Sequence, residues 1–145
     1  MSAFARDDQG RLCAGGMPLG DIAASHGSPL YVYSGDGIRD DYRRFAAAVA
    51  PVDGSVHFAL KANSALGVIG LLAQHGAGAD IVSGGEMARA LAAGIPAEKI
   101  VFSGVGKLAE EIGAALDAGI GQINAESSQE VEAISQIAAA RGVQA

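Results

Sequence analysis

Residues 56–64 read VHFALKANS, and this stretch decides the fold. Bulky apolar residues alternate here with smaller or polar ones, with Val56, Phe58 and Leu60 on one side and His57, Ala59 and Lys61 on the other. A period of two predicts a β-strand with two different faces. Asn63 and Ser64 end the strand, and an apolar pattern with helical spacing follows. Lys61 is therefore expected at the carboxyl end of a strand, on the face with the smaller side chains.

The same order of strand and helix recurs along the chain. The predicted strands end 22, 20 and 23 residues apart, at Lys61, Ser83, Ser103 and Glu126. Alternation of this kind indicates a parallel sheet with helical crossovers, and four such units make half of an eight-stranded barrel, whose carboxyl-end rim carries active sites. The alternative is an open doubly wound sheet, but residues 76–81 lack the third glycine of its dinucleotide fingerprint. The predicted fold class is α/β, the amino-terminal half of a (β/α)8 TIM barrel.

Residues 1–34 have a different pattern from the rest. They predict a small hairpin, one or two helical turns at residues 19–26 and a strand at residues 30–33. We interpret residues 1–34 as a short β segment, part of a second β domain completed elsewhere in the sequence. Residues 35–145 are then the first half of the barrel.

The final residues, 141–145, resemble the approach to a fifth strand. Four parallel strands leave unpaired edges, which proteins normally cover. We therefore expect the chain to be the front part of a longer protein.

Composition excludes several classes of function. The net charge is −6, aromatic residues are 5% and Trp is absent, which argues against a nucleic-acid partner. Cys13 is the single cysteine and the three histidines share no ligand spacing, so no metal site is expected. No apolar run approaches the ~18 residues of a membrane span, and the amino terminus lacks a signal peptide. We expect no membrane partner and a cytoplasmic location.

Two segments fit the capping box of a helix start. Residues 83–86 read SGGE and residues 127–130 read SSQE, so capping is the main role expected for Ser83 and Ser127. The alternative for the glycines is that free amides at a helix start receive an anion such as phosphate. Residues 103–107, SGVGK, lack the first glycine and the final Ser or Thr of an ATP-binding loop, and we reject nucleotide binding.

Polar residues mark one face of the fourth predicted strand. Gln122, Asn124 and Glu126 are expected to line the mouth of the barrel, either at a functional site or in a purely structural hydrogen-bond network. His57 shares the face of Lys61 but lies about 13 Å deeper at ~3.3 Å per residue, so it is expected to fill the barrel interior.

From its position alone, Lys61 reads as a solvated cation. Three segments, residues 57–64, 76–90 and 100–107, change that interpretation. They resemble the pyridoxal phosphate-dependent decarboxylases of ornithine, arginine and diaminopimelate, which share an alanine-racemase-like barrel. The Lys-Ala-Asn box and the Asp-Ile-Val-Ser-Gly-Gly-Glu box occur in the family's order and spacing. The sequence Ser64-Ala65-Leu66 replaces the Tyr-Gly-His run of alanine racemases, which favours the decarboxylases.

The resemblance implies roles for single residues. Lys61 matches the lysine that forms the internal aldimine with pyridoxal 5'-phosphate, and Asp80 matches a second cofactor-binding position. Glu86 matches an acidic position near the cofactor, although it is alternatively only a cap. Asn124 and Glu126 join the predicted site through their place on the fourth strand. A strand-end lysine in a closed cavity loses hydration, which favours the neutral amine that attacks an aldehyde.

The resemblance also implies an activity, the decarboxylation of meso-diaminopimelate to L-lysine in lysine biosynthesis. The family forms homodimers with shared active sites, and its phosphate loop and stacking histidine are expected after residue 145. Residues 1–145 alone are therefore expected to be inactive. The alternatives are a decarboxylase of another basic amino acid and a non-catalytic relative that binds the cofactor, although retention of Lys61 speaks against the second.

Overall fold

The computed structural model describes residues 3–145, which form two compact units divided between Ala48 and Val49. The first unit holds β1 (Phe4–Arg6), β2 (Leu12–Ala14), β3 (Met17–Pro18), α1 (Leu19–His26) and α2 (Gly35–Val49). The second holds η1 (Ala50–Val52), β4 (His57–Ala59), η2 (Leu60–Ala62), α3 (Leu66–Gln74), β5 (Gly78–Ile81), α4 (Gly84–Ala92), η3 (Ala97–Lys99), β6 (Ile100–Phe102), α5 (Ala109–Ala118), β7 (Gln122–Ile123) and α6 (Ser128–Arg141).

The first unit contains the predicted hairpin. Its three strands form an antiparallel sheet in the order β1-β2-β3. The Asp7 carboxylate accepts the N–H groups of Gln9 and Arg11 at 3.0 and 2.8 Å and so closes the turn between β1 and β2. The predicted helix at residues 19–26 is confirmed as α1, and it stops at Gly27, whose φ is +83°. A residue without a side chain adopts this angle at little cost.

The strand predicted at residues 30–33 is wrong. This segment has no regular structure, and Tyr31 and Tyr33 are 90% and 56% exposed. The reason is that the sheet β1-β2-β3 does not extend to it. An apolar run without a neighbouring strand has nothing to pair with, whatever its intrinsic preference.

Contacts within the described residues divide the chain between Ala48 and Val49, and the domain boundary predicted between residues 34 and 35 stays a prediction. Helix α2 belongs with the first unit, because it packs on the start of the chain. A Cβ added at Gly37 would lie only 2.7 Å from the Cβ of Ala3. Helical periodicity indicates where α2 lies in the sequence but not which unit it packs against.

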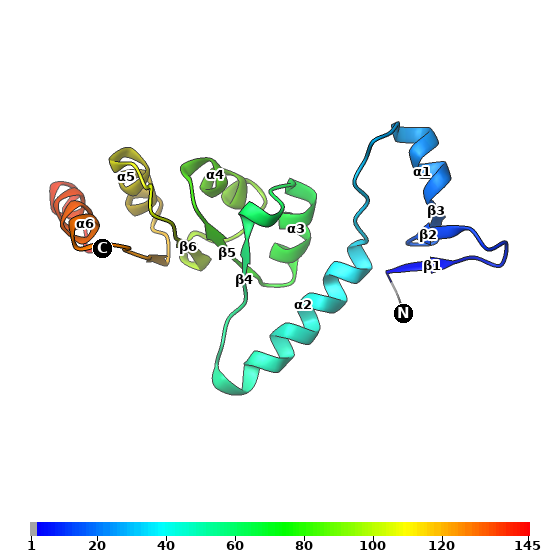
Figure 1. Ribbon diagram of the computed structural model, residues 1–145. Coiled ribbons are helices and arrows are strands. Elements are labelled where there is room, and N and C mark those ends of the chain that lie inside the picture. The colour runs from blue at the N-terminus through cyan, green and yellow to red at the C-terminus, as the bar shows by residue number, and fades with distance from the viewer. Residues whose placement is uncertain (1–2) are drawn as a thin grey trace. The chain divides into compact units, whose positions relative to one another are not determined.

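The second unit is the predicted parallel sheet with helical crossovers. Its strand order is β4-β5-β6-β7, so neighbours in sequence are neighbours in the sheet. Consecutive helices also contact one another, α3 with α4, α4 with α5 and α5 with α6 (Figure 1). This is the arrangement of one part of a TIM barrel, and it confirms the predicted fold class.

The two faces of this sheet have the predicted difference in character. One face packs against the helices, and its fully buried side chains are Leu60, Ala79, Ile81, Ile100 and Phe102. Each large apolar side chain buried in this way contributes roughly 1.5–3 kcal/mol to stability. The register places Ala59, Asp80, Val101 and Gln122 side by side on the opposite face. In a closed barrel that face looks inward.

All four strands end before the predicted residue, and the difference matters most for β4 and β7. Strand β4 ends at Ala59, and Leu60–Ala62 form a 3-10 turn whose first side chain is fully buried in the core. Strand β7 has only Gln122–Ile123, because it pairs on one side only and the chain then turns into α6. No helix in the described part of the chain has both the length and the apolar character needed to cross a bilayer.

Candidate active site

Lys61 lies directly after β4, in the 3-10 turn η2. Its neighbour Leu60 is fully buried and anchors the turn, whereas Lys61 itself is exposed. The loop that follows is fixed at two points. The Asn63 side chain accepts the N–H of Ala65 at 3.0 Å, and Arg89 of α4 donates to the carbonyl of Ser64 at 3.2 Å. The backbone around Lys61 is therefore held while its side chain is left open.

The amine of Lys61 differs from the other two lysine amines of the chain. Lys99 Nζ donates to the carbonyl of Gly76 at 3.2 Å, and Lys107 Nζ donates to three acceptors within the protein. Within residues 3–145, Lys61 Nζ has no hydrogen bond or ion pair. An amine attacks an aldehyde carbon through its lone pair, which an ammonium held by hydrogen-bond acceptors lacks. Lys61 is the lysine that meets this condition.

Asp80 lies on β5, on the inner face of the sheet. It pairs in register with Ala59, so Asp80 and Lys61 come from adjacent strands at the same end of the sheet. The half-buried Asp80 side chain accepts a hydrogen bond from Ser103 Oγ at 2.5 Å on its Oδ1 atom. Hydrogen bonds to carboxylates are short and strong, and this one fixes the orientation of Asp80.

A row of polar side chains continues from Ser103 across the sheet. Asn124 Nδ2 donates to Ser103 Oγ at 3.1 Å, and Gln122 Nε2 donates to Asn124 Oδ1. The predicted contact between Gln122 and Asn124 on a shared face is thus present. The sequence analysis did not assign Ser103 to the site. The regular spacing of the strand ends, which places Ser103 beside the ends of the neighbouring strands, was the pattern that could have indicated it.

Glu126 does not lie on the strand face predicted for it. It is exposed in the turn between β7 and α6, and its N–H donates to Glu130 Oε2 at 2.6 Å. The prediction failed because β7 ends at Ile123 and the alternation of faces ends with it. A role for Glu126 near the site stays a prediction.

The predicted capping by Ser83 and Ser127 is confirmed, whereas the glutamates reach back to the residue before the N-cap rather than to the N-cap itself. Ser83 Oγ accepts the N–H of Glu86 at 3.2 Å, and Glu86 Oε2 accepts the N–H of Val82 at 2.8 Å. Ser127 Oγ likewise accepts the N–H of Glu130 at 3.1 Å. The structure thus gives Glu86 a capping role, and a role near a cofactor stays a prediction.

The amide of Gly84, at the start of α4, already has an anionic partner. Glu111 of α5 accepts the Gly84 N–H on Oε1 at 2.7 Å and the Leu108 N–H on Oε2 at 3.0 Å. These two bonds, that of Leu108 foremost, hold the pKa of Glu111 below its usual value. The Gly84 N–H is therefore not available to a phosphate in this arrangement, and anion binding by the glycines at this helix start stays a prediction.

Lys107 is the second residue that sequence reasoning missed. Its side chain is 0% exposed, and Nζ donates to the carbonyls of Gly104 and Asn124 at 2.6 and 2.7 Å and to Glu130 Oε1 at 3.1 Å. Nζ also lies 5.7 Å from the centre of the Phe102 ring, within the range of a cation–π contact. Lys107, the last residue of the SGVGK segment, is thus held inside the protein by hydrogen bonds and an ion pair.

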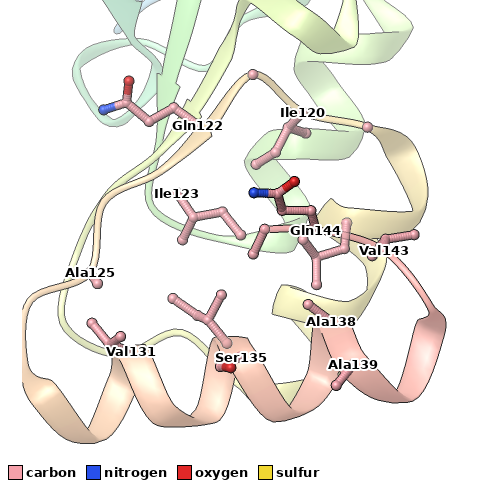
Figure 2. A pocket seen from close by; sticks show the side chains of 15 residues that line it. Ile120, Gln122, Ile123, Ala125, Val131, Ser135, Ala138, Ala139, Val143 and Gln144 are labelled. Carbon is pink, nitrogen blue, oxygen red and sulfur yellow. The ribbon is translucent and has the colours of Figure 1, made fainter.

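A hollow beside the free edge of β7 shares Gln122 with these groups and contains none of the others. Figure 2 shows Ile120 and Ile123 on one side of it and Val131 and Ala138 of α6 on the other. Its lining contains no ionisable side chain and neither Lys61 nor Asp80. Acid–base chemistry is therefore not expected there.

The amino-acid sequence of this chain is similar to a known protein family and to several characterised proteins. A family model described as the pyridoxal-binding domain of pyridoxal-dependent decarboxylases matches residues 36–144. The chain is 47% identical over 142 residues to a diaminopimelate decarboxylase of Zymomonas mobilis, which covers 94% of the chain and 33% of that protein. It is 52% identical over 137 residues to one of Pseudomonas fluorescens, with the same two shares.

Solved structures agree. A diaminopimelate decarboxylase of M. jannaschii in complex with L-lysine superposes with a TM-score of 0.90 at 36% identity, covering 96% of this chain and 33% of that one. One from Helicobacter pylori, also with L-lysine, gives 0.84 at 42% identity over 88% and 32%. The chain thus spans about a third of the length of these relatives. It belongs to the family of pyridoxal-dependent decarboxylases, and residues 36–144 are part of that family's pyridoxal-binding domain.

Proposed function

We propose that the whole protein is a pyridoxal phosphate-dependent decarboxylase that converts meso-diaminopimelate to L-lysine and carbon dioxide. The observation that carries this proposal is the free amine of Lys61, held directly after β4 in the part of the chain that matches the family's pyridoxal-binding domain. The diaminopimelate decarboxylases of M. jannaschii and H. pylori were solved with L-lysine, the product proposed here.

The residues present fit the aldehyde end of the cofactor. Lys61 would bind the aldehyde carbon covalently, and Asp80, fixed through Oδ1 by Ser103, would orient the reacting group. Pyridoxal phosphate, when bound, supplies an electron-withdrawing ring that stabilises the negative charge left as carbon dioxide departs. With substrate bound, the Lys61 amine would be available to accept and return a proton.

The phosphate end of the cofactor requires other groups. At the start of α4, the Gly84 N–H already donates to Glu111. We therefore propose that the phosphate is held by parts of the protein outside residues 3–145. A homodimer with shared active sites and a cytoplasmic location complete the proposal.

Borohydride trapping of the full-length protein tests the role of Lys61. After incubation with pyridoxal phosphate and reduction, we expect mass spectrometry to find the pyridoxyl group on the peptide that contains Lys61. A Lys61→Ala variant should lose the label and the release of carbon dioxide, whereas Lys99→Ala should keep both. A label on Lys99 or Lys107 in the wild type would overturn the proposal.

The substrate is tested separately on the same preparation. We expect carbon dioxide from meso-diaminopimelate and none from ornithine or arginine. Release from ornithine or arginine alone would keep the cofactor assignment and replace the substrate. Labelling of Lys61 with no turnover of any of the three would indicate a cofactor-binding relative without this activity.

A further inference from the structure

The fully buried ammonium of Lys107 has no part in the chemistry described so far. Removing an ammonium from water is unfavourable unless each of its N–H groups finds a partner. An ammonium has three donors, and Lys107 Nζ has three oxygen acceptors at 2.6, 2.7 and 3.1 Å. Its hydrogen bonding is complete, so the positions of the three acceptors are fixed relative to one another.

These acceptors come from three segments at the carboxyl-end rim of the sheet. Gly104 belongs to the loop after β6, Asn124 follows β7, and Glu130 is in the first turn of α6. Glu130 Oε2 also accepts the N–H of Glu126, so one carboxylate binds both Lys107 and the turn before α6. Lys107 therefore fastens the segment that follows β7.

From Asn124, hydrogen bonds lead to Asp80. The N–H of Asn124 donates to the carbonyl of Phe102 at 2.8 Å, which gives its backbone a second fixed point besides Lys107. The side-chain amide group of Asn124 donates to Ser103 Oγ. Because that nitrogen can only donate, the single proton of the Ser103 hydroxyl is directed to Asp80 Oδ1.

We propose that Lys107 is a positioning residue for Asp80, acting through Asn124 and Ser103. The inference rests on the proposed function, in which Asp80 contacts the cofactor. Within the described residues Asp80 Oδ2 has no hydrogen bond, so the network binds one oxygen of the carboxylate and leaves the other available. Without Lys107, the segment after β7 loosens, the Asn124 amide loses its place, and the Ser103 hydroxyl is free to turn away from Asp80.

A double-mutant cycle in the full-length protein tests this inference, with the dissociation constant of pyridoxal phosphate, measured by absorbance titration, as the readout. We expect Lys107→Met and Ser103→Ala each to weaken binding about tenfold, as loss of one charge-assisted hydrogen bond does. Ser103→Ala already breaks the link to Asp80. The double variant should therefore bind within about twofold of the weaker single variant, rather than showing the product of both effects.

Lys99→Met is the matched control. Lys99 also donates to a main-chain carbonyl, that of Gly76. Lys99 precedes β6 in the chain, whereas Lys107 follows it. Any increase that Lys99→Met causes in the dissociation constant of pyridoxal phosphate should multiply with the increase caused by Ser103→Ala. A Lys107→Met effect that multiplies in the same way would show a general loss of stability and would overturn the inference.

Hydrogen exchange of the protein without cofactor gives a second readout. In Lys107→Met, the amides of Asn124 and Glu126 should exchange faster than in the wild type, and in Lys99→Met they should not. If Lys107→Met fails to fold, Glu130→Gln replaces it in both measurements, since an amide keeps only one of the two acceptor oxygens. Unchanged exchange at Asn124 and Glu126 would refute the inference by itself. Failure of the wild type to bind pyridoxal phosphate would instead refute the proposed function.

Discussion

Glu111 joins the starts of two helices, and its removal provides a direct test of the structure. Its two carboxylate oxygens accept the N–H of Leu108 at the start of α5 and of Gly84 at the start of α4. In Glu111→Ala both amides lose their partner. Glu110, the preceding residue of α5, is exposed and makes no hydrogen bond in the described part of the chain, so Glu110→Ala is the matched control.

The expected loss follows from the two amides. Removing a side chain that caps a helix start costs about 1 kcal/mol for each N–H left without an acceptor, so the total is about 2 kcal/mol. The shift in melting temperature per kcal/mol decreases as a protein grows, from roughly 2–4 °C at 150–250 residues, and the relatives are about three times the length of this chain. The melting temperature of the full-length protein should therefore fall by about 2 °C. Glu110→Ala should change it by less than about 1 °C.

The loss should also depend on pH. The two N–H bonds lower the pKa of Glu111 in the folded protein below its ordinary value of 4.5. A lowered folded-state pKa gives stability that is fully present above the unfolded value and is lost as pH falls through the folded value. The difference between wild type and Glu111→Ala should therefore be largest near pH 7 and should narrow below about pH 4.5.

Thermal unfolding followed by circular dichroism, with the wild type and both variants measured from pH 7 down to pH 4, tests the size of the loss and its dependence on pH. Equal melting temperatures for Glu110→Ala and Glu111→Ala would contradict the bridging role. A difference that persists unchanged at pH 4 would show that the carboxylate charge is not what holds the two amides.

Three further outcomes are expected. Gly78→Ala should destabilise the full-length protein by about 2 kcal/mol or more in denaturant unfolding, since the new Cβ would lie 2.5 Å from His57 Nδ1 and from the Lys99 carbonyl oxygen. A loss below about 0.5 kcal/mol would show that these neighbours can move aside. Lys61→Met should retain the melting temperature of the cofactor-free protein within about 1 °C while abolishing decarboxylation, because the exposed side chain has no structural partner; a large loss of stability would contradict the free amine. Isolated residues 1–145 should release no carbon dioxide from meso-diaminopimelate, and measurable turnover in a radiometric assay would place the missing groups within them.

Most of the fold could be predicted from the alternation of bulky apolar residues with smaller or polar ones. Phe58 and Leu60 pack against the helices and Ala59 lies on the opposite face, as a period of two requires. The capping role of Ser83 followed from its spacing to Glu86, because a capping box is local in sequence. The strand predicted at residues 30–33 failed for the opposite reason, since a strand exists only where another strand pairs with it.

The candidate site was predictable only where a residue has a recognisable motif. Lys61 belongs to the Lys-Ala-Asn box, whereas Ser103 and Lys107 matter through partners 23 residues away, Asp80 for Ser103 and Glu130 for Lys107. No local pattern reports contacts at that range. The register of parallel strands creates them, and the register was not available from the sequence.

The starts of the helices explain why Lys107 is bound and Lys61 is free. Helices α4, α5 and α6 each carry a glutamate in the first turn whose carboxylate accepts main-chain N–H groups, namely Glu86, Glu111 and Glu130. Glu130 also takes up the ammonium of Lys107. Helix α3, which follows Lys61, has no acidic residue in its first turn, and an amide side chain, that of Asn63, closes its start instead. A carboxylate at that position would offer the Lys61 amine an ion-pair partner, whereas the uncharged Asn63 side chain does not.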